Sequence, residues 1–407
     1  MNVAVRGGGS SAENENHAAD VWTDRLGPSS GSRLRILYVV TEDWYFCSHR
    51  LPTARAARDM GFEVVVATHV DKHAEEIARE GFRVVPIPSL RTMRMPFGPL
   101  TAILALAAVY RREKPDIIHH IALVPTLFGS LAAILAGVRC SLATMTGLGL
   151  VFTAQSRKVR VLRAVVTRVL RWALAYRRSD LVFQNSDDQD FFLGAGIVPG
   201  DRAHLIAGSG VDIAAFHPTP EPEGPVIAAY VGRMLRPKGV LDIVEAARLL
   251  KRQGAPVRIV LVGAPDTTNP ESFSEEDLRR WQAEGVVEWW GVSNDVAEVW
   301  RQAHIALLPS YREGLPKSLL EAAACGRPMI ATDVPGCRDV VQSGETGLLV
   351  PLQDGAALAA AILALTKDGE ARRRMGQNAR AGVEQRFSNA VIATQMQGLY
   401  REILSRQ

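Results

Sequence analysis

The amino-acid sequence predicts an α/β protein made of two doubly wound domains. Short apolar runs that suit buried strands alternate with stretches of helical periodicity along almost the whole chain. Such β-α-β alternation is typical of parallel sheets with helices on both faces. The alternation restarts after the proline-rich segment 218–225, and 407 residues are too many for one ordinary core, which suggests two domains of ~150–200 residues each.

The expected elements divide the chain into four parts. Residues 1–33 are rich in Gly, Ser, Asn and acidic side chains and lack apolar periodicity, so we expect a disordered tail. The first domain is placed at 34–215, the second at 216–387, and a last helical segment at 388–407. In facing sheets of this kind ligands bind beyond the carboxyl ends of the strands, so we expect the site in the cleft. The expected strands cover 35–40, 63–67, 83–87, 116–119, 141–145 and 181–184 in the first domain, and 226–231, 258–262, 286–290, 305–308 and 328–332 in the second.

Composition places the protein among soluble globular α/β proteins, with 47% hydrophobic and 22% charged residues. Its four cysteines are scattered and offer neither a disulfide framework nor a zinc site, which suits a reducing cytoplasm. The N-terminal residues contain no apolar core of the kind a secretory signal needs. Two apolar stretches, 99–110 and 121–138, are too short or too interrupted for membrane spans and suit buried layers better.

The net charge of +4 conceals a strongly basic segment in the first domain, because no Asp or Glu occurs between Ile117 and Ser179. On a helical wheel, residues 156–178 form a basic amphipathic helix. Two interpretations stay open: docking on anionic lipid headgroups, or a core-facing helix with a solvated basic side. The basic side carries Arg157, Arg160, Arg163, Arg168, Arg171 and Arg178, and the opposite side carries Val159, Leu162, Val165, Val166, Val169, Trp172 and Ala173.

Two glutamates, Glu313 and Glu321, are separated by seven residues in a turn that leads into a helix. Carboxylates with this spacing can grip two hydroxyl-bearing groups of one ligand. Between them, Gly314, Leu315 and Pro316 form a helix entrance whose free backbone N–H groups attract anions such as phosphate. Hydroxyls on both sides of a diphosphate describe a nucleotide sugar.

A second anion-binding loop is expected after the first strand of the second domain, where Gly232 and Arg233 are followed by Lys238. Arginine can hold a diphosphate with two parallel hydrogen bonds, and lysine acts on it as a compact point charge. The alternative is an ordinary loop with two solvated cations, but the other anion-suited helix entrance in the same domain favours the diphosphate. The nucleotide base is expected near Gly291 and Val292, at the end of another strand.

These motifs resemble the retaining glycosyltransferases of the large bacterial family four. That resemblance covers about residues 34 to 404 and implies the GT-B fold, in which two Rossmann-like domains face a cleft and C-terminal helices return to the N-terminal domain. It rests on the Glu-x7-Glu motif, on the Gly-Arg and Lys-Gly pairs before it, and on segments 336–339 and 344–350 after it. Asp187, Asp188 and the neighbouring Asp190 are expected to open a helix after a strand and not to form the metal-binding turn of an Asp-x-Asp motif. We therefore expect neither a metal nor another cofactor.

The resemblance implies roles on the donor side. Arg233 and Lys238 would hold the diphosphate of a nucleotide sugar, with UDP as the expected nucleotide. Glu313 would contact the donor sugar, a hexose or an N-acetylhexosamine, and Glu321 the ribose hydroxyls. The acceptor would attack from the face that the diphosphate leaves, so that the anomeric configuration is retained.

Two histidines, His119 and His120, follow an apolar strand whose carboxyl end is expected at the cleft. The family commonly has a histidine at such a strand end, near the donor sugar and the acceptor. By this resemblance His119 would be catalytic, together with Glu313 and Lys238, and would stabilise an electron-poor sugar in the transition state. For His120 a catalytic and a structural role are equally open.

The chain departs from most family members after its first strand, where a bulky aromatic loop replaces a glycine-rich turn and a helix is expected to begin at Ser48. The Ser-His-Arg-Leu-Pro run here resembles a subgroup that extends lipid-linked oligosaccharides and exopolysaccharides on polyprenyl-diphosphate carriers. His49 or Arg50 would then meet the carrier phosphate. Gly147 and Gly149 would lie in a cleft loop close to the acceptor.

An acceptor anchored in a bilayer favours the lipid-docking interpretation of the basic helix 156–178, since the acceptor-binding domain must then contact the membrane. We therefore expect a cytoplasmic enzyme, peripheral on the inner face of the cytoplasmic membrane.

Three other classes fit the sequence less well. A nicotinamide dehydrogenase would need a G-x-G-x-x-G run after the first strand, and none follows Val40. A nucleotide-sugar epimerase or hydrolase of the same fold would keep the donor contacts and act without a sugar acceptor. A nucleic-acid binder could use the basic helix, but the composition, with 6% aromatic residues, and the donor motifs speak against it.

Overall fold

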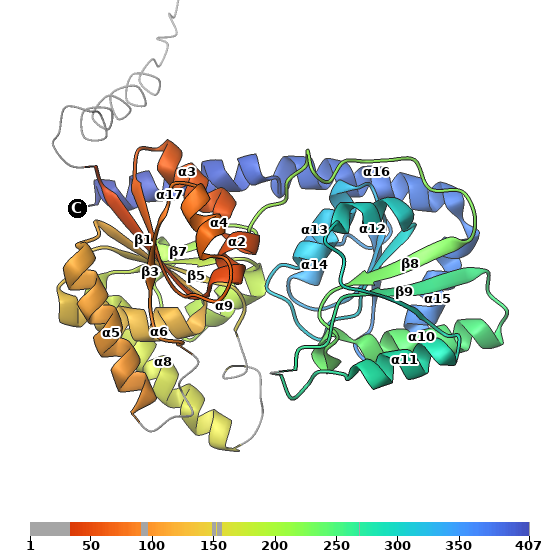
Figure 1. The fold of residues 1–407 in the computed structure, drawn as a ribbon, viewed down its shortest axis with the longest axis horizontal. Helices are drawn as coiled ribbons and strands as arrows, with labels where there is room; N and C mark the ends of the chain where they lie inside the picture. The colour runs from red at the N-terminus through yellow and green to blue at the C-terminus, as the bar shows by residue number, and fades with distance from the viewer. Residues whose placement is uncertain (1–32, 91–96, 149–151, 153–156, 268, 407) are drawn as a thin grey trace, which may run out of the picture.

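The chain folds into two α/β lobes joined side by side, as the computed structural model in Figure 1 shows. Each lobe contains one parallel sheet with helices on both faces, which confirms the predicted pair of doubly wound domains. The expected tail lies outside the described residues, apart from Arg33. The structure describes residues 33–90, 97–148, 152, 157–267 and 269–406.

The first lobe is built on a seven-stranded sheet in the order β3-β2-β1-β4-β5-β6-β7. Six of these strands were expected, and β7, only three residues long, was not. The strands are β1 (Arg35–Glu42), β2 (Glu63–His69), β3 (Arg83–Pro86), β4 (Ile117–Ile121), β5 (Ser141–Met145), β6 (Asp180–Phe183) and β7 (Ala203–Leu205). The helices are α2 (Asp43–His49), α3 (Leu51–Asp59), α4 (Ala74–Arg79), α5 (Gly98–Glu113), α6 (Leu123–Ala136), α8 (Arg157–Arg177), α9 (Ser186–Gly194) and the 3-10 turn η2 (Gly200–Arg202).

The second lobe is built on a six-stranded sheet in the order β10-β9-β8-β11-β12-β13. Its last strand, β13, was not expected as a strand. The strands are β8 (Val226–Val231), β9 (Val257–Val262), β10 (Glu288–Gly291), β11 (Ile305–Leu308), β12 (Met329–Thr332) and β13 (Gly347–Val350). The helices are the 3-10 turn η3 (Arg236–Lys238), α10 (Val240–Arg252), α11 (Glu275–Ala283), α12 (Val296–Gln302), α13 (Lys317–Ala324), α14 (Cys337–Val340), α15 (Gly355–Lys367), α16 (Gly369–Arg386) and α17 (Asn389–Ser405).

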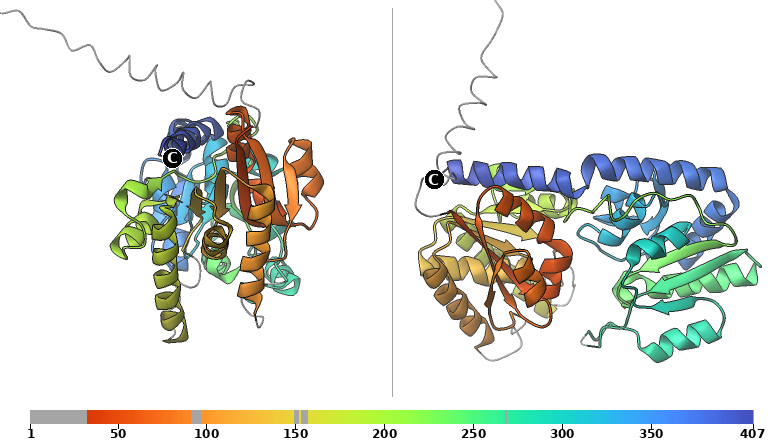
Figure 2. Two further views of the ribbon diagram at one scale, coloured as in Figure 1. Left: turned by 90° about the vertical axis from the view of Figure 1, so that its left-hand side faces the viewer. Right: turned by 45° about the horizontal axis from the view of Figure 1, so that its top comes forward.

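The last helix returns to the first lobe, as the resemblance implied. Helix α16 packs on the second lobe and α17 continues across to lie on α3 of the first lobe (Figure 2). The hydroxyl of Tyr400 in α17 lies 2.8 Å from that of Tyr38 in β1, and Gln397 donates a hydrogen bond to the backbone oxygen of Ala56 in α3. The domain limits at 215 and 387 stay predictions. The structure adds that the first sheet ends at Leu205 and the second begins at Val226.

Alternating residues of the first sheet enter two separate cores. Since successive side chains of a strand point to opposite faces, the neighbours His119 and His120 of β4 face different layers. The face with His119 is covered by α3 and α17, and the face with His120 by α5, α6 and α8. Both sheets are therefore buried on both sides, which explains the continuous apolar runs in the sequence.

Helix α8 buries less of its apolar side than the wheel predicted. Val166, Leu170, Ala173 and Leu174 are buried against the domain. Trp172 was expected on the side opposite the arginines, yet it is 55% exposed. The described arginines of α8 are partly or fully exposed. The helix thus shows three stripes, namely a buried one, a basic one, and an exposed apolar one that contains Val161, Leu162, Val165, Trp172 and Tyr176.

Candidate functional site

The loop after β8 carries the two cations predicted to hold a diphosphate. Lys238 ends the short turn η3, and its Nζ lies 2.6 Å from Oε1 of Glu313, so the loop is joined to the glutamate motif. Arg233 is more open, with its side chain 54% exposed and paired with Asp266 at 3.2 Å. The turn needs glycine at 239, where φ is +71° and an added Cβ would lie 2.0 Å from the backbone oxygen of Pro309.

The second glutamate of the motif is buried at the first turns of α13. Burial raises the pKa of the Glu321 carboxyl above its usual value, and nearby Lys317 offsets part of that rise. The Nζ of Lys317 lies 3.5 Å from Oε1 of Glu321. Each glutamate is thus held by one lysine, and Lys317 is a site residue that the sequence reasoning missed. The sequence feature that could have identified Lys317 is its position as a cation in the first helical turn after Gly314, Leu315 and Pro316.

Gly314 lies at a tight contact between the two lobes. An added Cβ there would lie 2.3 Å from the backbone oxygen of Thr146 and 3.0 Å from Oε1 of Gln184, both in the first lobe. Gly147, with φ of +129°, lies opposite, because its own added Cβ would meet Gly314 at 3.9 Å. The predicted cleft loop at Gly147 therefore does face the glutamate motif. Gly149 lies outside the described residues.

Helix α9 of the first lobe holds the same loop with hydrogen bonds and ion pairs. The carboxamide of Asn185 donates to the backbone oxygen of Gly314 at 2.7 Å, and Arg312 pairs with Asp188 at 2.5 Å. Arg338 pairs with Asp187 at 3.3 Å. Both acids lie in the first turn of α9, as predicted. The ion pairs of Asp187 and Asp188 therefore connect the first lobe to the second.

The expected base site lies at the carboxyl ends of β9 and β10. Gly291 has φ of +72°, and its backbone oxygen accepts a hydrogen bond from Gly263 at 2.7 Å. Val292 is 68% exposed at the end of β10. The role of these residues in holding a nucleotide base stays a prediction.

Ser48, His49 and Arg50, which were expected on the acceptor side, lie where α2 meets α3, and Lys317 of α13 contacts this turn. The expected helix start at Ser48 is wrong, because α2 begins at Asp43 and the Ser48 hydroxyl donates to the backbone oxygen of Trp44 at 2.8 Å. The backbone oxygen of Ser48 accepts a hydrogen bond from Lys317 at 2.8 Å, which joins this turn to the donor-side helix. His49 is partly exposed, and Arg50 is only 3% exposed.

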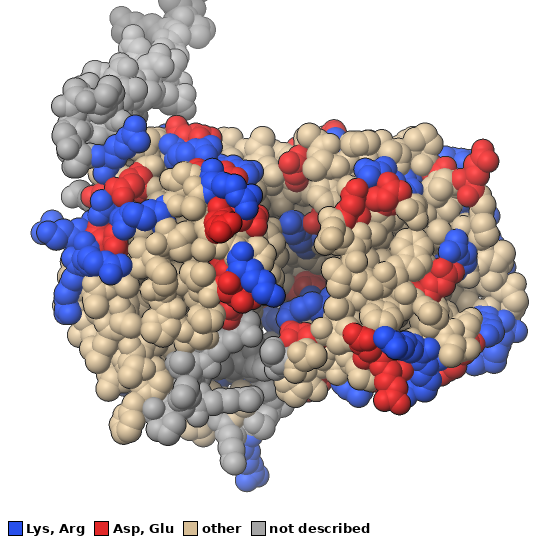
Figure 3. Space-filling model, in the orientation of Figure 1, with Lys and Arg blue, Asp and Glu red and all other residues tan. Residues whose placement is uncertain are grey.

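Charged side chains of both signs lie in the hollow between the two lobes (Figure 3).

Two family models match this chain, "Glycosyl transferases group 1" over residues 213–382 and "Glycosyl transferase 4-like" over residues 35–186. The alpha-maltose-1-phosphate synthase of Mycolicibacterium smegmatis is 30% identical over 358 residues, which cover 82% of this chain and 91% of that protein. The chain belongs to the group 1 glycosyltransferases.

A second relative is the N,N'-diacetylbacillosaminyl-diphospho-undecaprenol alpha-1,3-N-acetylgalactosaminyltransferase of Campylobacter jejuni. It is 27% identical over 368 residues, which cover 87% of this glycosyltransferase and 95% of the relative. The Anabaena protein HepE, solved in complex with UDP-glucose, superposes with a TM-score of 0.70 at 18% identity and covers 92% of this chain and 100% of its own. That likeness shows that the fold is the same GT-B arrangement.

The expected position of His119 in this glycosyltransferase is wrong. Its side chain is fully buried, with Nδ1 2.9 Å from the hydroxyl of Tyr400 and Nε2 2.7 Å from the hydroxyl of Thr144. Burial, and to a lesser extent Arg50, lower the pKa of this imidazole well below its usual value. His119 points into the layer under α17 because that face of β4 carries the odd-numbered residues. It fastens the returning helix and does not reach the cleft.

His120 is equally remote from the cleft. It is fully buried on the other face of β4, and its Nε2 lies 3.0 Å from the hydroxyl of Tyr110. Burial lowers the pKa of His120 to about 3. Close packing surrounds the ring, since a Cβ added at Gly129 would lie 2.2 Å from Nε2. The structure supports the structural alternative for this residue.

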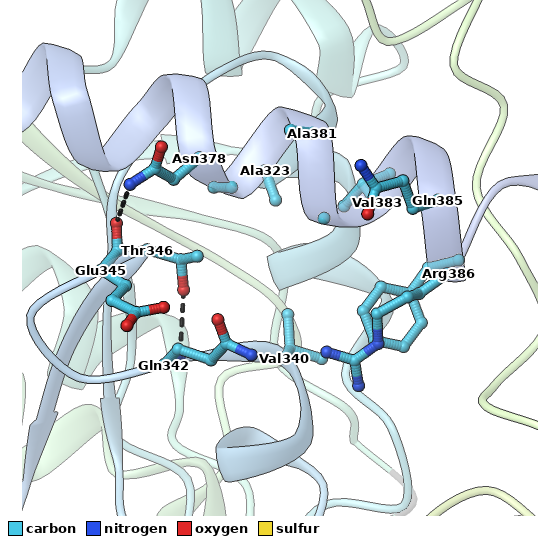
Figure 4. Close-up of a pocket in the computed structure, with 13 residues that line it drawn as sticks. Ala323, Val340, Gln342, Glu345, Thr346, Asn378, Ala381, Val383, Gln385 and Arg386 are labelled. Carbon is cyan, nitrogen blue, oxygen red and sulfur yellow. Dashed lines mark hydrogen bonds between the residues drawn. The ribbon is translucent and has the colours of Figure 1, made fainter.

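Away from the cleft, a pocket lies between α16 and the segment that follows α14 (Figure 4). Asn378 donates to the backbone oxygen of Glu345 at 3.0 Å, and the Thr346 hydroxyl accepts from the backbone of Gln342 at 2.9 Å. These polar groups already satisfy one another and fasten α16 to the sheet. The pocket is separate from the glutamate motif.

Neither a metal site nor a membrane-spanning helix is found in the part of the chain that the structure describes. Within the described ranges no group of three or more His, Cys, Asp or Glu side chains could hold a metal ion. In the same part of the chain, no helix is both long and apolar enough to cross a membrane.

Proposed function

We propose that this glycosyltransferase moves a hexose or an N-acetylhexosamine from a UDP-sugar to a saccharide on a polyprenyl-diphosphate carrier, with retention of anomeric configuration and without a metal. One observation carries the donor half of the proposal. Two lysine–glutamate pairs, Lys238 with Glu313 and Lys317 with Glu321, lie beside an anion-suited helix entrance in the cleft.

The pairs supply what departure of a nucleoside diphosphate requires. Negative charge develops on the diphosphate oxygens as the sugar leaves, and fixed cations stabilise that charge most where water is excluded. Arg233, Lys238 and the backbone N–H groups after Gly314 would receive the diphosphate. Glu313 would grip the hydroxyls of the sugar and Glu321 those of the ribose. The glutamates also keep the lysines extended toward the cleft before the donor binds.

The acceptor half rests on Arg50 and on the relatives. The Nε and Nη2 atoms of Arg50 are buried and make no hydrogen bond in the part of the chain that the structure describes. A buried guanidinium without a carboxylate is costly, so it favours an anion on this side of the cleft. The Campylobacter enzyme is named for a diphospho-undecaprenol acceptor, and the Mycolicibacterium enzyme for a sugar phosphate product. A phosphate next to the acceptor sugar suits both names.

We also propose that α8 and α5 dock on an anionic membrane. The two helices extend toward the same end of the first lobe in Figures 1 and 2, with α6 packed against both. Leu100 and Leu104 of α5 are about half exposed, like Val165 and Trp172 of α8. An exposed apolar stripe beside arginines is the composition of a helix that lies in the headgroup region. Such docking would place the enzyme on the cytoplasmic face of the membrane that holds the carrier.

Vesicle sedimentation tests the docking. With Arg157, Arg160 and Arg168 all replaced by Gln, we expect binding to vesicles rich in phosphatidylglycerol to weaken about 100-fold, because each basic residue near the surface contributes roughly 1 kcal/mol. A matched triple variant, Arg252→Gln with Arg373→Gln and Arg374→Gln, changes exposed arginines of the second lobe and should bind like the wild type. Equal binding by both triple variants would exclude α8 as the docking surface.

A donor panel tests the activity. The purified enzyme is incubated with UDP-glucose, UDP-galactose and their N-acetylamino counterparts, together with undecaprenyl-diphosphate N-acetylglucosamine. We expect one donor to give a longer lipid-linked saccharide, and Lys238→Ala to lower kcat by ~10²–10³, as loss of a charge-stabilising group does. Lys367→Ala, an exposed lysine of α15, is the control. Altered free nucleotide sugar without lipid product would favour the epimerase or hydrolase alternative, which nothing in the comparisons supports.

A further inference from the structure

His49 lies where the first lobe meets the donor motif of the second. It ends α2, and its ring stacks on that of Tyr45, with centroids 4.3 Å apart and planes 7° from parallel. The preceding residue, Ser48, accepts the hydrogen bond from Lys317, which pairs with Glu321. The imidazole is therefore one residue away from a contact that joins the two halves of the site.

The hydrogen bonds of Ser48 determine which nitrogen of His49 carries the proton. The single hydroxyl proton of Ser48 is directed to the backbone oxygen of Trp44 at 2.8 Å. With the hydroxyl proton in that direction, we infer that Ser48 Oγ, which lies 2.6 Å from His49 Nδ1, accepts from that nitrogen. Nδ1 is thus protonated and Nε2 has a free lone pair. His49 is partly exposed, and its Nε2 is not among the buried unpaired atoms of the described residues.

The charged groups that act on this ring are cations from each element around it. They are Lys317 of α13, Arg50 at the start of α3 and Lys238 of η3. Burial, followed by these cations, lowers the pKa of His49 to about 3, although a hydrogen bond to the Tyr45 backbone acts to raise it. The imidazole therefore stays neutral at any physiological pH. The neutral ring can accept a hydrogen bond at Nε2, but it is not protonated at physiological pH.

We propose that Nε2 of His49 accepts a hydrogen bond from the attacking hydroxyl of the acceptor and orients that hydroxyl for transfer. This inference rests on the proposed glycosyl transfer. In that step the bond between the acceptor oxygen and the anomeric carbon forms while the bond between that carbon and the diphosphate oxygen breaks. The hydroxyl proton passes to a diphosphate oxygen. His49 fixes the direction of the nucleophile.

Two reactions of the same enzyme separate an acceptor role from a donor role. One is transfer to undecaprenyl-diphosphate N-acetylglucosamine, and the other is slow hydrolysis of the same UDP-sugar when no acceptor is present. For His49→Ala we expect transfer to fall about 100-fold, the usual cost of a misplaced nucleophile. Hydrolysis and the donor Kd should stay within twofold. His217→Ala, an exposed histidine of the linker, is the matched control and should change neither reaction.

Two outcomes would overturn the proposal. Equal loss of transfer and hydrolysis in His49→Ala would mean that the residue serves the donor or the fold, and transfer within twofold of the wild type would remove it from the reaction. His49→Asn, which keeps a hydrogen-bond acceptor, should recover part of the transfer activity. Failure of the wild type to use any UDP-sugar would instead refute the proposed function.

A spectroscopic measurement tests the tautomer without any turnover. With ¹⁵N-labelled histidine, the Nε2 signal of His49, assigned by its loss in His49→Ala, should keep the shift of an unprotonated nitrogen from pH 5.5 to 8. An ordinary titration near pH 6.5 would contradict a neutral ring held by Ser48 and the three cations. Ser48→Ala should allow the proton to move between the two nitrogens and should lower transfer several-fold.

Discussion

Replacement of His119 by Phe should destabilise the first lobe and leave the chemistry almost untouched. The imidazole makes two hydrogen bonds in a fully buried layer, at 2.9 Å to Tyr400 and 2.7 Å to Thr144. A typical buried hydrogen bond contributes ~1 kcal/mol, and a hydroxyl left unpaired in the core costs ~1–3 kcal/mol. Tyr400 keeps Tyr38 at 2.8 Å, so Thr144 is the group that loses its partner. We therefore expect a loss of about 2–4 kcal/mol.

Thermal melting and steady-state kinetics measure the two consequences separately. For a domain of this size ~1 kcal/mol corresponds to ~2–4 °C in Tm, so His119→Phe should melt roughly 5–15 °C lower. At 20 °C, where the variant is folded, kcat should stay within about threefold of the wild type because no reacting group is touched. His217→Phe is an exposed control that should change neither value. A Tm within 1 °C of the wild type together with a 100-fold lower kcat would refute the buried, structural role.

Two further predictions concern the contact between the lobes and the response to acid. Gly314→Ala places a Cβ 2.3 Å from the backbone oxygen of Thr146, so we expect the lobes to separate, with a larger radius of gyration in X-ray scattering and about tenfold lower kcat/KM. Gly382→Ala, where an added Cβ meets nothing within 4 Å, should leave both values unchanged, and an unchanged radius in both variants would contradict the tight contact. The folded state of the first lobe keeps His119 and His120 neutral with lowered pKa values, whereas the unfolded chain binds protons there below about pH 6.5. The contribution of these two neutral histidines to the free energy of unfolding is fully present above pH 7.5. Toward pH 5 the free energy of unfolding should fall by up to ~1.4 kcal/mol per pH unit for each histidine. The midpoints of urea unfolding measured at several pH values would show this decrease. In His120→Gln the slope should be shallower, and an identical slope would argue against the buried neutral ring.

The residues predicted on the donor side could be found from the sequence because each lies in a short local motif, although Lys238 and Glu313 are 75 residues apart. Glu313 and Glu321 are fixed by one loop and one helix, and Lys238 follows directly from β8. Local geometry of this kind is encoded by spacing and turn chemistry. Sequence spacing could not predict which side chain forms an ion pair or a hydrogen bond with each charged residue. Lys317 was overlooked because its importance depends on Ser48, 269 residues away in the sequence.

The wrong predictions depend on tertiary packing, because the neighbours of a side chain decide whether it is buried or exposed. His119 was expected at the end of an apolar strand, but it lies inside β4, and the returning helix α17 covers that face and buries the ring. The wheel for α8 separated arginines from apolar residues, but the width of the buried stripe depends on how much of the helix its neighbours cover, and Trp172 lies outside it. Ser48 suited a helix start, but α2 already includes it.

By itself the sequence determined the two doubly wound domains and the spacing of the two glutamates, because periodicity and short-range spacing act within a few residues. Only the tertiary structure decided that Gly314 meets Thr146, that Lys317 holds Ser48, and that His49 lies beside the donor lysines and not His119. These are contacts between segments more than 160 residues apart, whose pairing depends on how two finished domains and one shared helix pack together, and no local pattern carries that information.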